Sequence, residues 1–132
     1  REKNITIDLG ALPEIYADET MMRLVIMNLL GNAIKFTSNK EKPFIKISAG
    51  EDNRQYVIYV RDNGVGFDPR FSDKIFEVFQ RLHKSSEFEG TGIGLAIAAK
   101  IINRHDGSIR AESELGKGTT IYFNIPKRKK DE

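Results

Sequence analysis

Alternating apolar and polar positions predict several strands along the chain. Residues 5–9 alternate, and Pro13 closes the turn that follows them. A further short strand is expected at 14–17. The remaining strands are predicted by alternation and β-branched residues at 44–49, 56–60, 109–112 and 119–125.

Helical patterns occupy the stretches between these strands. Asp18 is expected to cap a helix that runs to about Thr37, because a short acceptor side chain stands before an acidic first turn. A second long helix is expected over 93–103, with Ile93, Ile97 and Ile101 forming its core stripe, and a short helix is expected near 72–79. The order strand, helix, two strands, helix, two strands predicts an open, largely antiparallel sheet with the helices on one face.

The composition is that of a soluble globular domain. The chain has 132 residues, of which 39% are hydrophobic and 30% charged, and its net charge of +2 is too small to indicate nucleic-acid binding. It contains no cysteine, which excludes disulfides, thiolate metal sites and a cysteine nucleophile. We expect one domain over residues 1–126 and a basic tail or linker over 127–132. We expect a cytoplasmic location without membrane contact by this domain, and any anchor of a membrane-bound parent would lie outside the chain.

The first helix carries a polar stripe within an otherwise apolar sequence. Asn28, Asn32 and Lys35 are four and three residues apart, which places them on one narrow face beside the bare backbone of Gly31. This stripe could be the solvated face of an ordinary amphipathic helix. However, asparagine disfavours helix interiors, whereas its amide oxygen suits Mg²⁺ and a nearby lysine suits phosphate.

The segment that follows the strand at 56–60 also admits two interpretations. Its Asn-Gly pair is typical of a β-hairpin turn, but the residues after it do not alternate, and Pro69 argues against a paired strand. The alternative is a binding loop in which Gly64 and Gly66 allow the close approach of a flat ligand. Asp62 at the strand end would then accept a hydrogen bond from the amino group of adenine.

A glycine-rich loop opens the second long helix. Gly90, Gly92 and Gly94 alternate with other residues before the helix begins, which favours a phosphate at the helix N-terminus. The loop is not a P-loop, because Leu-Ala follows Gly94, and it is not a dinucleotide fingerprint, because Ile97 stands where a small residue is required. A plain turn before a core helix remains compatible with the same residues.

Taken together, the motifs "NLLGNAIKFT", "DNGVGF", "IFEVFQRLH", "GTGIGLAIAAKI" and "GSIRAESELGKGTTIYFNIP" resemble those of the GHKL ATP-binding superfamily. Their order is most similar to the catalytic, ATP-binding domain of bacterial sensor histidine kinases, and the resemblance extends from about Ile5 to Pro126. It implies the Bergerat fold, an α/β (α+β) two-layer sandwich with a mixed, mostly antiparallel sheet of about five strands packed on three helices.

The resemblance also implies ATP and Mg²⁺ as ligands. Asn32 would hold the metal, Lys35 and Arg81 would act on the phosphates, and Asp62 would bind adenine. The lid over the nucleotide would run from about residue 67 to residue 92, with Phe76 and Phe79 as its hydrophobic anchors. The other implied nucleotide-binding residues are Asn28, Phe36, Gly64, Gly66, Gly90, Thr91, Gly92, Gly94, Leu95 and Thr119.

The implied activity is donation of the γ-phosphoryl group of ATP to a histidine. His83 and His105 do not lie in an acceptor motif, so the partner would be a separate helical dimerisation and phosphoacceptor domain, with a response regulator downstream. Related ATPases place a glutamate where Asn28 stands, so we expect poor ATP hydrolysis. Because dimerisation in this family belongs to the separate helical domain, we expect a monomer in isolation. Two alternatives are a nucleotide-binding regulatory module and an anti-sigma-type serine kinase.

Overall fold

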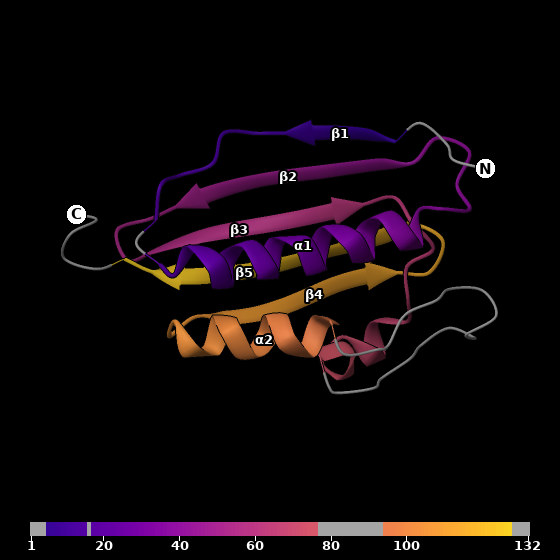
Figure 1. Ribbon diagram of the computed structural model, residues 1–132. Helices are drawn as coiled ribbons and strands as arrows, with labels where there is room; N and C mark the ends of the chain where they lie inside the picture. Colours follow the sequence, from indigo (N-terminus) through magenta and orange to yellow (C-terminus); the bar gives the residue numbers. More distant parts are fainter. Residues whose placement is uncertain (1–4, 16, 77–93, 128–132) are drawn as a thin grey trace.

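The computed structural model describes residues 5–15, 17–76 and 94–127 of the chain. They form one five-stranded sheet with the strand order β1-β2-β3-β5-β4 (Figure 1). β1 runs parallel to β2 and every other neighbouring pair is antiparallel, which confirms the predicted mixed, mostly antiparallel sheet. The strands are β1 (Thr6–Leu9), β2 (Phe44–Glu51), β3 (Gln55–Asp62), β4 (Ser108–Glu114) and β5 (Gly118–Pro126).

Two α-helices, α1 (Glu19–Phe36) and α2 (Gly94–Arg104), cover one face of the sheet. Asp18 caps α1 as expected, because its carboxylate accepts a hydrogen bond of 2.9 Å from the backbone N–H of Met21. α1 packs on β3 and against α2, while α2 packs on β4 and β5. Within the described ranges, no helix is both long enough and apolar enough to cross a membrane.

The structure corrects two of the predicted elements. In place of a short helix near 72–79, two single 3-10 turns form at Pro69–Phe71 and Lys74–Phe76, and residues 77–79 lie outside the described part. The described part therefore holds two α-helices, where three helices were expected. Residues 14, 15 and 17 do not form the predicted strand, because the chain there crosses from the sheet to the start of α1.

The hydrophobic core lies between the sheet and the two helices. Val25, Leu29 and Ala33 of α1 face the sheet and are buried. In α2 the buried residues are Ala98, Ile101 and Ile102, whereas Ile97 is 36% exposed, so the expected stripe through Ile97 is wrong. The helix turns its small residue inward because α1 packs closely beside it; Ile93 lies outside the described residues.

The helix layer ends before the sheet does. β1, at the edge of the sheet, has no helix of the described part over it (Figure 1), whereas Ile45 and Ile47 on the helix-facing side of β2 are buried. Ile7 and Leu9 of β1 are accordingly 47% and 63% exposed, although their positions in the strand match the buried side of β2.

Candidate functional site

Three of the predicted motifs meet at the C-terminal end of α1. The backbone N–H of Val65 donates to the carbonyl oxygen of Phe36 (3.1 Å), and the N–H of Gly116 donates to the carbonyl of Val65 (2.7 Å). The side chain of Asn63 also bonds to the backbone of Lys42 and of Phe44. The loop after β3 is thus held between α1 and the β4–β5 turn, and the structure does not form the alternative hairpin.

Asp62 is a buried carboxylate at the end of β3. It accepts a hydrogen bond of 2.8 Å from the N–H of Gly64, and it is 8% exposed. Burial raises the pKa of the Asp62 carboxyl from its ordinary 3.8 to about 6, although backbone hydrogen bonding at Gly64 and Thr119 opposes the shift. A carboxyl at this position therefore carries its charge at neutral pH at an energetic cost.

Thr119 lies opposite Asp62 in the β3–β5 register and is also buried. The hydroxyl of Thr119 lies 2.8 Å from the hydroxyl of Ser113. The Ser113 hydroxyl in turn accepts a hydrogen bond of 2.8 Å from the backbone N–H of Phe67. Ser113 thus links the loop after β3 to β5, a positioning role that the motifs did not indicate. The sequence could have indicated this role, because Ser113 is two residues from the buried Ala111 in β4 and therefore places a polar side chain on the core-facing side of the strand.

The two glycines of this loop each stand where a side chain would collide with backbone. A Cβ atom at Gly64 would overlap the carbonyl oxygen of Phe36, and one at Gly66 would overlap that of Glu114. Gly66 also has a φ of 68°, which glycine adopts readily. Both glycines therefore have a packing role that brings the loop against its neighbours.

The predicted polar stripe lies on the flank of α1 that faces α2. Nδ2 of Asn28 is buried without a hydrogen-bond partner in the structure described, and a Cβ atom at Gly94 would lie 3.3 Å from Oδ1 of the same side chain. The first motif and the start of α2 are thus adjacent. Asn32 is half-buried, Lys35 is exposed, and Gly31 has open space around it. A buried amide hydrogen without an acceptor is costly for folding alone, and it suits a ligand that supplies one.

The donor set of this flank fits Mg²⁺ as part of a metal–phosphate complex. Across the described ranges, no three His, Asp, Glu or Cys side chains gather closely enough to hold a metal. The neutral amide oxygens of Asn28 and Asn32 are acceptable Mg²⁺ ligands when phosphate oxygens and waters complete the octahedron. These residues therefore fit an ion that arrives with its phosphates.

Several predicted site residues cannot be placed. The lid lies mostly outside the described residues, as do Phe79, Arg81, His83, Gly90, Thr91 and Gly92. Phe76 is described and packs against the core, as does Leu95 in the first turn of α2. His105 has a structural role: its Nδ1–H donates to the carbonyl of Ile101 (2.9 Å), and its Nε2 accepts from the N–H of Asp18 (3.3 Å).

Comparison with known families finds a family model that covers most of the chain. Residues 17–129 match the family model described as histidine kinase-, DNA gyrase B- and HSP90-like ATPase. The catalytic domain of the histidine kinase ThkA has a TM-score of 0.77 at 31% identity, over 93% of this chain and 80% of that one. The full-length structure of ShkA in complex with AMPPNP has the same TM-score and identity, over 92% of this chain and 25% of that one.

Curated relatives include a phytochrome, a phytochrome-like protein and a sensory kinase. Cyanobacterial phytochrome A of Nostoc sp. is 51% identical over 93% of this chain, and the phytochrome-like protein Cph1 of Synechocystis sp. is 46% identical over 95%. The adaptive-response sensory kinase SasA of Gloeothece citriformis is 40% identical over 95%. The chain spans 16% and 17% of the two phytochromes and 31% of SasA, so these relatives are several times longer.

Proposed function

Because the chain belongs to the family of histidine kinase-, DNA gyrase B- and HSP90-like ATPases, and its relatives are sensor histidine kinases, we propose that it binds Mg-ATP and donates the γ-phosphoryl group to a protein histidine. The acceptor would lie on a separate helical dimerisation domain, and a response regulator would receive the group afterwards. His105, the one histidine of the described part, does not supply such an acceptor, since it is engaged between the start of α1 and the end of α2.

The observation that carries this proposal is the buried carboxylate of Asp62. Its described partners are backbone N–H groups and no cation, so burial leaves one acceptor position to be satisfied by a ligand. The exocyclic amino group of adenine supplies the required donor, whereas guanine presents a carbonyl oxygen at the corresponding place. Asp62 would therefore select ATP over GTP.

The polar flank of α1 would bind the other end of the nucleotide. Asn32 would contact Mg²⁺, Asn28 would donate its unsatisfied N–H to a phosphate or a metal-bound water, and Lys35 would neutralise phosphate charge. The N-terminus of α2, beside Asn28, would face the same anions. These groups position the phosphates, and positioning with charge neutralisation supplies most of phosphoryl-transfer catalysis.

The transfer itself would be a displacement at phosphorus. A nitrogen of the acceptor imidazole forms a bond to the γ-phosphorus while the bond to the β,γ-bridging oxygen breaks and ADP leaves with that electron pair. The imidazole proton is released to solvent. In this chain Asn28 stands where related ATPases carry a glutamate, and an amide cannot take a proton from water. Hydrolysis of ATP by this domain should therefore be slow.

The test is calorimetric titration of the chain with a non-hydrolysable ATP analogue and Mg²⁺. We expect adenine-selective binding that the GTP analogue does not reproduce and that Asp62→Asn weakens at least 100-fold, because one hydrogen bond to a charged group is lost and an unfavourable donor pair is created. Equal affinity for both analogues, or an unchanged affinity in Asp62→Asn, would refute the adenine assignment.

A further inference from the structure

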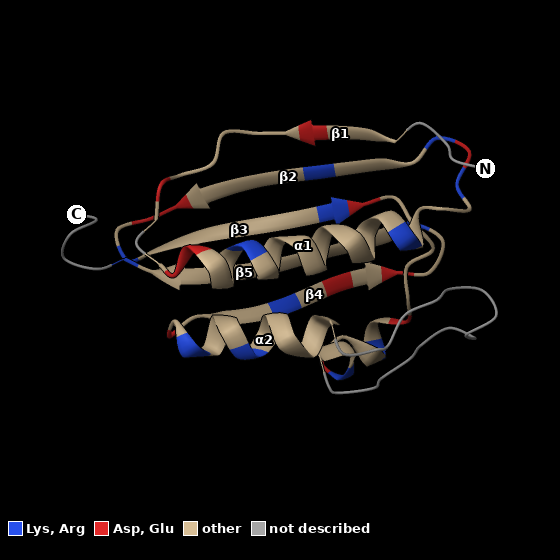
Figure 2. Ribbon diagram, viewed as in Figure 1, with Lys and Arg blue, Asp and Glu red and all other residues tan. Residues whose placement is uncertain are grey.

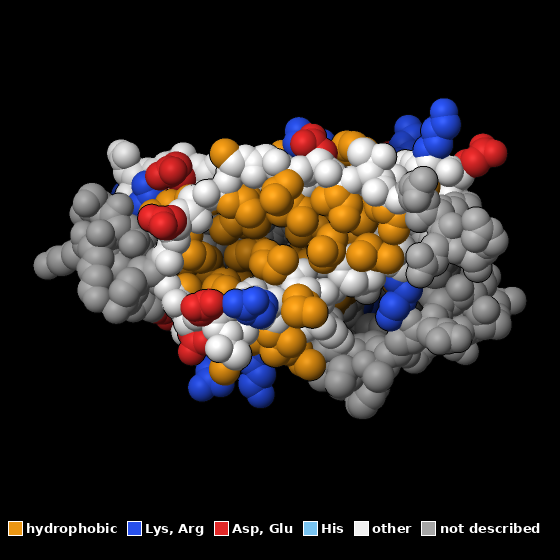
Figure 3. All heavy atoms as spheres, turned by 45° about the horizontal axis from the view of Figure 1, so that its top comes forward, with side chains coloured by type: hydrophobic (Ala, Val, Ile, Leu, Met, Phe, Trp, Pro, Cys, Tyr) orange, Lys and Arg blue, Asp and Glu red, His pale blue; other side chains and the backbone are white. Residues whose placement is uncertain are grey.

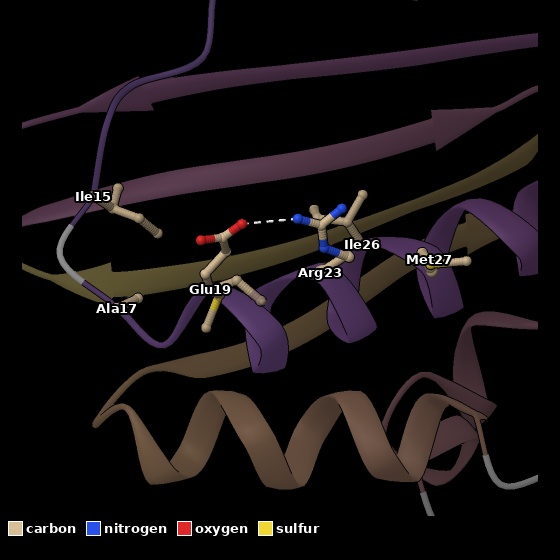
Figure 4. A pocket seen from close by; sticks show the side chains of 7 residues that line it. Ile15, Ala17, Glu19, Arg23, Ile26 and Met27 are labelled. Carbon is tan, nitrogen blue, oxygen red and sulfur yellow. Dashed lines mark hydrogen bonds and ion pairs between the residues drawn. The ribbon is translucent and has the colours of Figure 1, made fainter.

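The two ends of the domain differ in what they can recognise. Acidic residues lie where β3 and β4 finish (Figure 2), and the polar groups there are held in fixed directions by hydrogen bonds. Along α1, by contrast, hydrophobic side chains gather in one field on the surface (Figure 3). A pocket of about 590 Å³ at the start of α1 is also lined mainly by aliphatic groups, and its Glu19 and Arg23 are paired with each other at 2.8 Å (Figure 4). Selection between ligands by hydrogen bonding is therefore expected at the first of these ends.

The hydroxyl of Ser113 has three neighbours and one proton. The N–H of Phe67 donates to it (2.8 Å), the carbonyl oxygen of Gly118 lies 2.9 Å away, and the hydroxyl of Thr119 lies 2.8 Å away. A carbonyl oxygen can only accept, so the proton of Ser113 is donated to Gly118. The short contact between the two hydroxyl oxygens also needs a proton, and the remaining one belongs to Thr119. The Thr119 hydroxyl therefore donates to Ser113.

This direction of the hydrogen bond makes Thr119 an acceptor toward any further partner. Its hydroxyl bonds to no other group of the described residues, so the lone pairs of the oxygen are unused. Asp62 is the register partner of Thr119 on the helix-facing side of the sheet, where opposite Cβ atoms are about 5 Å apart. The carboxylate of Asp62 accepts from backbone N–H groups and does not receive the Thr119 hydroxyl proton. Two acceptor side chains thus stand side by side.

A pair of acceptors selects a ligand group that has two hydrogens to donate. A primary amino group on an aromatic ring meets this requirement, whereas a carbonyl oxygen in the same place would face lone pairs from both residues. A threonine hydroxyl that was free to rotate would not make this distinction, because it can donate as well as accept. The selectivity of Thr119 therefore depends on the neighbour that takes its proton, which is Ser113.

We propose that Ser113 is a positioning residue for base selection. By accepting the hydroxyl proton of Thr119, it makes Thr119 an obligate acceptor, so that Asp62 and Thr119 together accept both N–H groups of the exocyclic amino group of adenine. This inference rests on the proposed function, because it concerns the same end of the nucleotide. It adds a second acceptor to the carboxylate and names the residue that fixes the polarity of that acceptor.

The test titrates the chain with a non-hydrolysable ATP analogue and with its hypoxanthine counterpart, which carries an oxygen in place of the amino group and an N–H beside it. The unchanged chain should prefer the ATP analogue about 100-fold or more. In Ser113→Ala the Thr119 hydroxyl is released, so it can donate to the hypoxanthine oxygen while Asp62 accepts from the ring N–H. The preference should therefore fall about tenfold or more, mainly because the hypoxanthine analogue binds more tightly.

Further variants separate this effect from a loosened loop. Adding Thr119→Val to Ser113→Ala should abolish the gain for the hypoxanthine analogue, because no hydroxyl is left to donate. Ser113→Thr keeps a hydroxyl and should retain the preference of the unchanged chain. Ser108→Ala is the matched control, since Ser108 lies at the other end of β4 and its hydroxyl bonds to Asn124, and it should leave the preference unchanged.

A measurement without nucleotide tests the hydrogen bond itself. In NMR spectra of the ¹³C,¹⁵N-labelled chain, the hydroxyl proton of Thr119 should show a nuclear Overhauser effect to the β-protons of Ser113. The amide hydrogen of Phe67 should exchange faster in Ser113→Ala, because it loses its acceptor. An Overhauser effect from the Thr119 hydroxyl to the β-protons of Asp62 in place of Ser113 would overturn the proposal.

The binding results distinguish this inference from the proposed function. If the ATP analogue binds selectively and Ser113→Ala weakens both analogues equally, nucleotide binding stands, the proposal is overturned and Ser113 is a packing residue only. If neither analogue binds to the unchanged chain, the proposed function itself is refuted, and base selection is refuted with it.

Discussion

The two flanks of α1 differ in chemistry although they belong to the same eighteen residues. The flank toward α2 carries Asn28, Asn32 and Lys35, and one of its amide groups is buried without a partner. The flank away from α2 carries Met27 and Ile34, which are apolar and exposed. Folding thus leaves a polar group buried without a partner on one flank, and it leaves apolar side chains exposed to solvent on the other.

This contrast shows why α1 looks apolar in nearly every direction in the sequence. A helix that only supported the core would need one apolar face and could leave both flanks solvated. Here the sheet-facing side forms the core, one flank holds an amide without a hydrogen-bond partner, and the other flank exposes apolar side chains. The polar flank is suited to an anion with its metal, whereas the apolar flank leaves the large side chains of Met27 and Ile34 exposed.

The largest expected effect comes from the polar flank. Asn32→Ala should weaken phosphoryl transfer to a supplied acceptor domain about 100-fold or more, because a ligand of the metal–phosphate complex is lost. Met27→Ala, on the other flank, should change the rate less than twofold. Single-turnover transfer of labelled phosphate measures both variants. Equal losses in the two variants would show that the flanks are not functionally distinct.

Replacing the buried carboxylate should strengthen the fold while it removes binding. Asp62 has a raised pKa, so its ionisation favours the unfolded state, and this penalty grows as the pH rises from 3.8 to about 6 and is constant above. The difference between these two pKa values corresponds to a penalty of about 3 kcal/mol, which the variant avoids. The amide oxygen of the variant would accept a weaker hydrogen bond from the N–H of Gly64, which would reduce this gain by about 1 kcal/mol. Asp62→Asn should therefore raise the free energy of unfolding without nucleotide by about 2 kcal/mol at pH 7.5.

Urea denaturation at pH 7.5 and pH 4 checks this expectation. The gain should shrink toward zero or reverse at pH 4, where the carboxyl is largely protonated in the folded state. A variant that is less stable than the unchanged chain at both pH values would contradict it, and would mean that the carboxylate holds the loop after β3 in place.

Acid should weaken nucleotide binding through the same residue. Adenine is bound by the ionised carboxylate, so affinity should be constant from pH 8 to 7 and fall about tenfold per pH unit below about 6. Calorimetric titration with the ATP analogue at pH 8, 7, 6 and 5 measures the profile. In Asp62→Asn the weak residual binding should not show this step; a step retained in the variant would assign it to another group.

The smallest effect should come from the orphan amide of the polar flank. Asn28→Leu replaces a buried N–H that has no described partner with an apolar group of similar size, and should stabilise the fold by about 1 kcal/mol. Thermal unfolding without nucleotide measures this difference. Asn103→Leu, at an exposed position of α2, is the matched control and should change stability by less than about 0.5 kcal/mol. A loss of stability in Asn28→Leu would show that this amide is hydrogen-bonded in the folded state.

Periodicity predicted most of the fold because most of its helices and strands have one buried side. In β3 buried and less buried residues alternate along the strand, and the cap at Asp18 follows from local chemistry alone. Periodicity failed at Ile97, where large apolar residues were preferred to the neighbouring Ala98. The close packing of α2 on α1 requires the small residue inside, and this requirement is visible only when both helices are in place.

The site was predictable only in part. Asp62, Thr119 and the asparagines of α1 stand in recognisable motifs, and the structure brings the first two together across β3 and β5. The link through Ser113 depends on the pairing of β4 with β5, which no local pattern specifies. The exposure of β1 could not be predicted, because an exposed apolar strand has the same sequence pattern as a buried one.

β1 has a consequence for the dynamics of the domain. It has four residues, all exposed, and it is held by one neighbour across a crossover that includes the whole of α1. Because this strand buries little surface and closes a long loop, its detachment should need less free energy than that of any other strand of the sheet. Its amide hydrogens should therefore exchange with solvent ahead of those of β3 and β5.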